Sequence, residues 1–271
     1  MDNDGIKDLV ITGEWLAPTI FKNDHKNLVV SGLNKSLQNE TGLWNTIVAE
    51  DFDKDGKMDL CAGNFGLNSQ LEATEKKPLE LYVTDIDNNG TLDPVLTCYN
   101  GDSTHPFTPM DDLIGQVPSL RKKFYDYDAY ANASVKEILP PDKFSSAEKK
   151  QVFNLQTTYF KNTGNGFIKQ QLPVEAQYAP VYAIQLADVN RDGFTDMILM
   201  GNNNFVRIRL GRQDANKGVV LLNDKKGNFS WVSSKQTGLH IPGDVRSSLV
   251  IDKHLLIGVN NQNVLSYIIN K

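Results

Sequence analysis

Acidic side chains recur in this sequence at a spacing that suits a hard metal ion. A nonapeptide that starts at Asp51 returns with the same pattern from Asp85 and from Asp188. Each copy has an oxygen-bearing side chain at positions one, three, five and nine, and a glycine at position six. Ca²⁺ takes about six to eight oxygen ligands, and alternate residues of a curled loop point inward to supply them. The spacing therefore predicts three calcium loops, named here the first, second and third loops.

Position seven of each loop is expected to contribute its backbone carbonyl oxygen, because its side chain varies freely. Glycine at position six permits the positive φ of a sharp turn. The first loop gathers four carboxylates, which repel one another without a cation, and we expect it to bind Ca²⁺ most tightly. The predicted ligands are Asp51, Asp53, Asp55, Lys57 and Asp59 in the first loop, Asp85, Asp87, Asn89, Thr91 and Asp93 in the second, and Asp188, Asn190, Asp192, Phe194 and Asp196 in the third.

Ordinary turns and EF-hands are the alternatives to calcium loops of this kind. Asp, Asn and Gly gather in turns of many types, but turns alone do not predict three copies in register. An EF-hand needs a bidentate Glu at position twelve and helices on both sides. Position twelve here is Ala62, Leu96 and Leu199, and the flanking segments resemble strands. The EF-hand interpretation therefore fails.

A fourth, shorter copy stands at the start of the chain. Asp2, Asp4, Gly5 and Asp8 match positions three, five, six and nine. Position one would lie before Met1, so we expect the chain to begin inside a repeat. Because its first ligand is missing, this copy should bind Ca²⁺ weakly or not at all.

Apolar runs stand on both sides of the loops. Thr46–Ala49 precedes the first loop, and Tyr82–Thr84 precedes the second. Tyr182–Ala187 precedes the third loop, and Met197–Met200 follows it. Continuous apolar runs are typical of strands buried on both faces, as in stacked sheets. Many short strands joined by Gly, Asn and Asp turns favour a β-propeller. We therefore expect residues 1–271 to form a single all-β domain, a propeller or propeller fragment of about four to five blades.

The regular spacing breaks between the second and third loops. From about 108 to 153 the pattern is helical, and Ser145 with Glu148 predicts a capping box at the start of a helix over 145–153. We expect a helical insertion here, which either covers a binding site or is a surface excursion. Because the segment interrupts a repeat, we also expect that it can be shortened without unfolding the propeller.

The loops, together with Asp59–Asn68 and its Phe65-Gly66 pair, resemble the FG-GAP/VCBS repeat family. That family is related to the integrin α-chain propeller. The sequence is more narrowly similar to the VCBS-repeat proteins of Bacteroidota, which often carry an ASPIC/UnbV module. The resemblance implies a calcium-binding β-propeller. No ASPIC/UnbV module is visible in this sequence. The sequence departs from the family pattern at Gly201–Phe205, and the last repeat, after Gly243, has no acidic loop and should hold without calcium.

Composition and charge exclude several classes of protein. Apolar residues make up 40% of the chain and charged residues 23%, as in an ordinary globular protein. The net charge is −5 with scattered Lys and Arg, so we expect no nucleic-acid partner. We also expect no membrane span and no targeting signal within the sequence. Cys61 and Cys98 are expected to be buried thiols, with a bridge between neighbouring strands as the alternative.

The sequence favours a binding protein over an enzyme, and we predict no catalytic residues. The histidines have neither metal-ligand nor triad spacing; they are His25, His105, His240 and His254. A basic and aromatic group near a channel would suit an anionic glycan; its members are Arg207, Arg209, Arg212, Arg246, Tyr178 and Tyr182. Pairing of these arginines with Asp214 and Asp244 is the slightly favoured alternative.

We therefore expect a secreted or envelope-attached scaffold, with Ca²⁺ as its cofactor, that binds or adheres to a glycan or protein through a loop face. The alternative function is a Ca²⁺-assisted polysaccharide lyase with a propeller fold.

Overall fold

The computed structural model describes residue 1 and residues 4–269, and their contacts divide the chain into two compact units. The larger unit contains the chain up to Gln70 and from Leu155 onward, and the smaller unit is Leu71–Asn154. We expected a single domain from the sequence. The smaller unit is inserted between two strands of one sheet of the larger unit, which the repeat pattern did not indicate.

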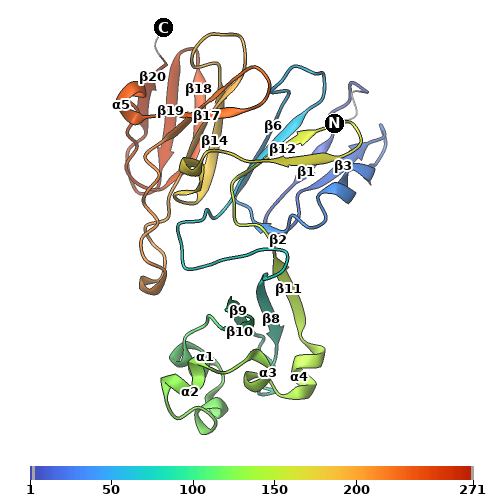
Figure 1. Ribbon diagram of the computed structural model, residues 1–271, viewed down its shortest axis with the longest axis vertical. Helices are drawn as coiled ribbons and strands as arrows, with labels where there is room; N and C mark the ends of the chain where they lie inside the picture. Colours follow the sequence, from blue (N-terminus) through green and yellow to red (C-terminus); the bar gives the residue numbers. More distant parts are fainter. Residues whose placement is uncertain (2–3, 270–271) are drawn as a thin grey trace. The chain divides into compact units, whose positions relative to one another are not determined.

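The larger unit contains four antiparallel sheets, named here in chain order. The first sheet is β1 (Leu9–Ile11), β3 (Thr19–Asn23) and β4 (Leu28–Val30); the second is β13 (Phe167–Gln170), β12 (Thr158–Asn162), β7 (Asp59–Gly63) and β6 (Thr46–Glu50). The third is β14 (Val181–Ala187), β15 (Asp196–Gly201), β16 (Val219–Asn223) and β17 (Phe229–Val232); the fourth is β18 (Val245–Ile251), β19 (His254–Val259) and β20 (Leu265–Ile268). In Figure 1 these sheets follow one another across the unit from the blue end of the chain to the red end.

Short elements complete the larger unit. They are the strand pair β2 (Glu14–Leu16) and β5 (Gly42–Leu43), the 3₁₀ turns η1 (Gly32–Ser36), η3 (Val174–Gln177) and η4 (Ile208–Leu210), and the helix α5 (Ser234–Thr237).

Each pair of neighbouring sheets encloses a hydrophobic core. Ile20 of the first sheet packs with Leu60 and Phe160 of the second. The core between the second and third sheets includes the buried residues Cys61, Val181, Met197 and Leu221. The core between the third and fourth sheets includes Ile198, Val220, Leu255 and Ile257. Strands β7 and β15 are buried along their whole length. This confirms the prediction of a strand buried on both faces for Met197–Met200, whereas Thr46–Ala49 of β6 is half-buried to exposed.

Sheet order shows how distant segments of the chain are joined. Strand β14 contacts β6 on one side and β18 on the other, so the first strands of the second, third and fourth sheets are neighbours. The second sheet is built from two segments, because β7 pairs with β12, which follows the smaller unit in sequence. Figure 1 shows this as the cyan strand β6 in the same sheet as the yellow strand β12.

The smaller unit combines one sheet with several short helices. Its sheet has the order β10 (Ser103–Pro106), β9 (Asp93–Asn100), β8 (Leu79–Thr84) and β11 (Glu148–Val152). Its helical elements are α1 (Met110–Gln116), η2 (Pro118–Lys122), α2 (Tyr127–Ala131), α3 (Val135–Ile138) and α4 (Pro141–Ser146).

Two expectations for the segment 108–153 are wrong. Residues 148–152 form a strand paired with β8, not a helix, and its Lys149 bonds the buried Glu80 of β8 at 2.6 Å. The capping box lies earlier, where Glu137 accepts the backbone N–H of Ser134 at 2.7 Å. Pairing with a strand far along the chain overrides the local helical pattern, as tertiary context often does.

The helices pack into the core of the smaller unit. Leu113, Val117 and Ile138 are almost fully buried and belong to one core with Tyr82 and Val95 of the sheet. The helical segment and β11 therefore supply much of what holds the smaller unit together. That the segment can be shortened without unfolding the propeller stays a prediction.

Both cysteines are free, which agrees with the favoured interpretation of two thiols. Burial raises the pKa of the Cys61 thiol to about 12, while Cys98 is half-buried. No helix in the described part of the chain combines the length and apolarity needed to cross a bilayer.

Candidate metal centres

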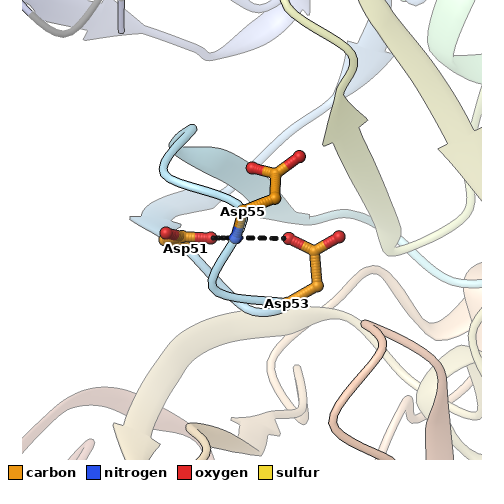
Figure 2. A group of neighbouring side chains, drawn as sticks. All are labelled: Asp51, Asp53 and Asp55. Atoms are coloured by element: carbon orange, nitrogen blue, oxygen red, sulfur yellow. Dashed lines mark hydrogen bonds between the residues drawn. The ribbon is translucent and has the colours of Figure 1, made fainter.

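The first loop joins β6 to β7 and folds around the carboxylate of Asp51. The backbone N–H of Asp55 donates to Asp51 Oδ1 at 3.0 Å and to Asp53 Oδ1 at 3.3 Å, and the N–H of Gly56 donates to Asp51 Oδ2 at 2.9 Å. Figure 2 shows Asp51 and Asp53 on either side of the Asp55 nitrogen. Gly56 has a φ of 85°, which confirms the conformation expected at position six.

The second and third loops repeat this arrangement. The N–H at position five donates to the Asp at position one, from Asn89 to Asp85 at 3.0 Å and from Asp192 to Asp188 at 3.1 Å. The glycine N–H at position six donates to the second oxygen of the same Asp, at 2.9 Å in both loops. Each loop joins the two strands of a hairpin, β8 with β9 and β14 with β15, as predicted.

Position four also has a left-handed backbone in all three loops, which the sequence did not reveal. The φ values are 56° at Lys54, 61° at Asn88 and 60° at Arg191. A positive φ is uncommon for residues other than glycine. Its recurrence at one position shows that the three loops share a backbone conformation as well as a pattern of acids.

Carboxylate oxygens converge in two of the loops. One oxygen each from Asp51, Asp53 and Asp55 lie within 4.8 Å of one another, and the same holds for Asp85, Asp87 and Asp93. The third loop has Asn190 at position three, so an amide oxygen replaces one carboxylate there. Asp53 is part of the first group, whereas Asp59 is not.

The aspartate at position nine anchors the first and third loops to their sheets. Asp59 Oδ1 accepts the N–H of Asn162 on β12 at 2.7 Å, and Oδ2 accepts the hydroxyl of Tyr159 at 2.7 Å. Asp196 accepts the N–H of Asn223 on β16 at 2.8 Å in the equivalent way. Burial raises the pKa of both Asp59 and Asp196. A carboxylate oxygen has two lone pairs, so an anchored aspartate can still ligate a cation.

Lysines neutralise part of the first loop. Lys57 Nζ lies 2.7 Å from Asp55 Oδ2, and Lys161 of β12 bonds Asp53 Oδ2. The hydrogen bond from Lys57 lowers the pKa of Asp55. Counting carboxylates in the sequence missed Lys161, because it lies far along the chain and reaches the loop only through the β7–β12 pairing.

The donor set fits calcium better than a transition metal. The converging groups are carboxylate oxygens from Asp alone, which are hard ligands preferred by Ca²⁺, and the two groups include no His or Cys. The ligand roles of position seven (Lys57, Thr91 and Phe194) stay predictions.

The acidic residues of the shortened copy at the chain start bond to nearby residues. Asp2 lies outside the described residues. Asp8 pairs with the amino group of Met1 at 2.6 Å, and Asp4 Oδ1 accepts the N–H of Ile6 at 2.9 Å. Weak or absent Ca²⁺ binding by this copy stays a prediction.

The favoured pairing of arginines with acids is present for Arg246 and Arg212. Arg246 lies 3.7 Å from Asp244 and stacks over the Tyr182 ring at 4.0 Å, and Arg212 lies 3.7 Å from Asp214. A pocket of about 390 Å³ adjoins these residues; it is lined by Asn204, Phe205, Arg212, Asp214, Lys217, Pro242, Gly243, Asp244, Asn260, Asn261 and Gln262.

Comparison with known proteins supports the repeat assignment for part of the chain. Residues 1–62 match a family model described as an FG-GAP-like repeat. This segment contains the shortened copy, β6 and the first loop, and it ends within β7. No curated protein matches the chain. The chain is thus a mostly β protein with an FG-GAP-like repeat in residues 1–62 and acidic clusters suited to metal binding.

Proposed function

We propose that this protein is a calcium-binding β-propeller or propeller fragment, in which Ca²⁺ holds the blade loops closed. The observation that carries the proposal is the shared geometry of three loops. They have the same hydrogen bonds onto position one and the same two positive φ values, and in two of them three aspartates converge.

The physical role of the cation follows from the charges. Three carboxylates within 4.8 Å repel one another, and a divalent cation turns that repulsion into attraction. Metal binding and loop folding then stabilise each other by mass action. Extracellular calcium modules bind at about 10⁻⁴–10⁻³ M. Such affinities favour a location outside the cytoplasm, in the envelope or beyond it.

We further propose that the protein is a binding scaffold for a glycan or protein and has no catalytic activity. The 390 Å³ pocket offers the side-chain amides of Asn260, Asn261 and Gln262 beside the exposed ring of Phe205. Amides beside an aromatic ring suit the hydroxyls and apolar faces of a sugar. Glycan-array binding without release of cleaved product would support the scaffold, and product release would favour the lyase.

Calcium calorimetry on the whole chain tests the metal proposal. The variant that combines Asp51→Asn, Asp85→Asn and Asp188→Asn should lose at least about tenfold in affinity, because each change removes a charge at position one. Asp24→Asn is the matched control, since Asp24 also accepts two backbone N–H groups in a turn but lies outside the loops. Equal calcium binding by the wild type and the triple variant would contradict the proposal.

A further inference from the structure

The first and third loops, on neighbouring sheets, are tied to one side chain in the β16–β17 hairpin. Asn223 is 4% exposed. Its side-chain amide donates to the carbonyl of Phe52 in the first loop at 2.8 Å and to that of Thr195 in the third loop at 3.1 Å. Its backbone N–H donates to Asp196 at position nine of the third loop at 2.8 Å. One buried residue thus fixes the backbone of both loops.

A second set of contacts joins the first loop to the same hairpin. Phe52, at position two, is fully buried with its ring edge-on to Phe229 at 5.3 Å and to Tyr159 at 5.5 Å. Tyr159 in turn donates to Asp59 at position nine of the first loop. Displacement of the first loop would therefore disturb the hairpin that also holds the third loop.

The two loops touch directly as well. Lys54 Nζ, at position four of the first loop, lies 4.5 Å from the ring centre of Phe194 at position seven of the third. The hydroxyl of Thr195 donates to Glu50 Oε1, at the end of β6, at 3.3 Å. The contacts of Asn223 are therefore part of a continuous interface between the two loops.

We propose that Asn223 is a positioning residue shared by two calcium loops, so that Ca²⁺ binding at either loop strengthens binding at the other. The inference rests on the proposed calcium function. A cation that orders one loop fixes Asn223, and the second cation then meets a loop that is already partly ordered. The coupling is reciprocal, as equilibrium linkage requires.

Two matched variants separate coupling from general stability. Asn223→Asp removes the amide donors to Phe52 and Thr195 but keeps a side-chain oxygen for the N–H groups of Lys225 and Gly227. Asn162→Asp is the control, because Asn162 occupies the place beside the first loop that Asn223 occupies beside the third. The Asn162 amide donates to Met58 within the first loop.

The readout is an NMR titration of ¹⁵N-glycine-labelled whole chain with Ca²⁺. The amides of Gly56, Gly90 and Gly193 stand at position six of the three loops and report on each separately. Asp188→Asn should weaken Ca²⁺ binding at the third loop, and the titration of the Gly193 amide verifies this in the same sample. The Gly56 midpoint should then move to a Ca²⁺ concentration about fivefold higher or more, while Gly90 does not move.

The double variants decide the role of Asn223. In an Asn223→Asp background, Asp188→Asn should no longer shift the Gly56 midpoint, whereas in an Asn162→Asp background the shift should persist. A residue with a merely structural role would lower both affinities and leave their coupling intact. A Gly56 midpoint unchanged by Asp188→Asn, or a shift that survives Asn223→Asp, would overturn the inference while the calcium function stands. If none of the three glycines responds to Ca²⁺, both proposals fail.

Discussion

Replacing Lys161 by Gln should tighten calcium binding at the first loop. The ammonium of Lys161 bonds Asp53, and this hydrogen bond raises the pKa of Lys161, so the lysine is charged at neutral pH. Asp53 is one of the three converging carboxylates. The ammonium occupies Asp53 Oδ2, so an incoming cation competes with it for this carboxylate.

The expected gain in Ca²⁺ affinity follows from the exposure and the charge of Lys161 and Asp53. The Lys161 and Asp53 side chains are 27% and 10% exposed, and a pair so close to solvent contributes up to about 1 kcal/mol. Repulsion between the ammonium of Lys161 and the bound divalent cation adds about 1 kcal/mol at a separation of about 8 Å in water. Removing both effects should tighten binding by about 1–2 kcal/mol, or about 5- to 30-fold.

Calcium titration followed at the Gly56 amide measures this change at the first loop alone. Lys169→Gln is the matched control, because Lys169 on β13 pairs with Glu40 at 2.9 Å and touches no loop carboxylate among its described contacts. The control should change the affinity by less than about twofold. An unchanged or weaker affinity in Lys161→Gln would refute the competition argument. The expectation that the first loop binds most tightly stays a prediction, which calorimetry on Asp53→Ala and Asp87→Ala would test.

Three further changes test the fold. Leu113→Ala should destabilise the smaller unit by about 2–5 kcal/mol in urea unfolding, because this fully buried side chain leaves a cavity. Glu137→Gln should lower stability at pH 7 but not near pH 2, because hydrogen bonds at the start of α3 lower the folded-state pKa of Glu137. The resulting stability is present above the unfolded value of about 4.3 and is lost as pH falls through the folded value. Gly201→Ala should lower the melting temperature of the larger unit, since a Cβ there would lie 1.8 Å from the Pro180 carbonyl oxygen. Gly115→Ala is the control, because its Cβ meets open space in α1, and it should be neutral or stabilising in thermal melts.

The loops could be predicted because each is encoded by adjacent residues. In the second loop, Asp85 and Gly90 stand five residues apart and bond each other directly. Position four escaped prediction because Lys54, Asn88 and Arg191 share no residue type, although they share a backbone conformation. The loop geometry, not the residue type, dictates that torsion.

The division into two units could not be predicted, because it depends on pairings between distant segments. The β7–β12 pair closes the second sheet across the whole smaller unit. The charged residues of β11 gave a helical pattern, yet Val152 lies opposite Leu79 in the β8 register and Lys149 forms an ion pair with Glu80. The same long-range pairing brings Lys161 to Asp53, so the charge balance of the first loop was also hidden.

Thermal melting of the whole chain at pH 7, in 10 mM Ca²⁺ and in excess EDTA, tests the central claim most directly. With a dissociation constant near 1 mM, each loop should add about 1.4 kcal/mol of stability in Ca²⁺. For a chain of this size, that shifts the melting temperature by roughly 3–6 °C per loop coupled to unfolding. We expect a higher melting temperature in Ca²⁺, and a smaller rise when Asp51, Asp85 and Asp188 are changed to Asn. A melting temperature that is the same in Ca²⁺ and in EDTA, in protein verified to be metal-free in the chelator, would contradict it.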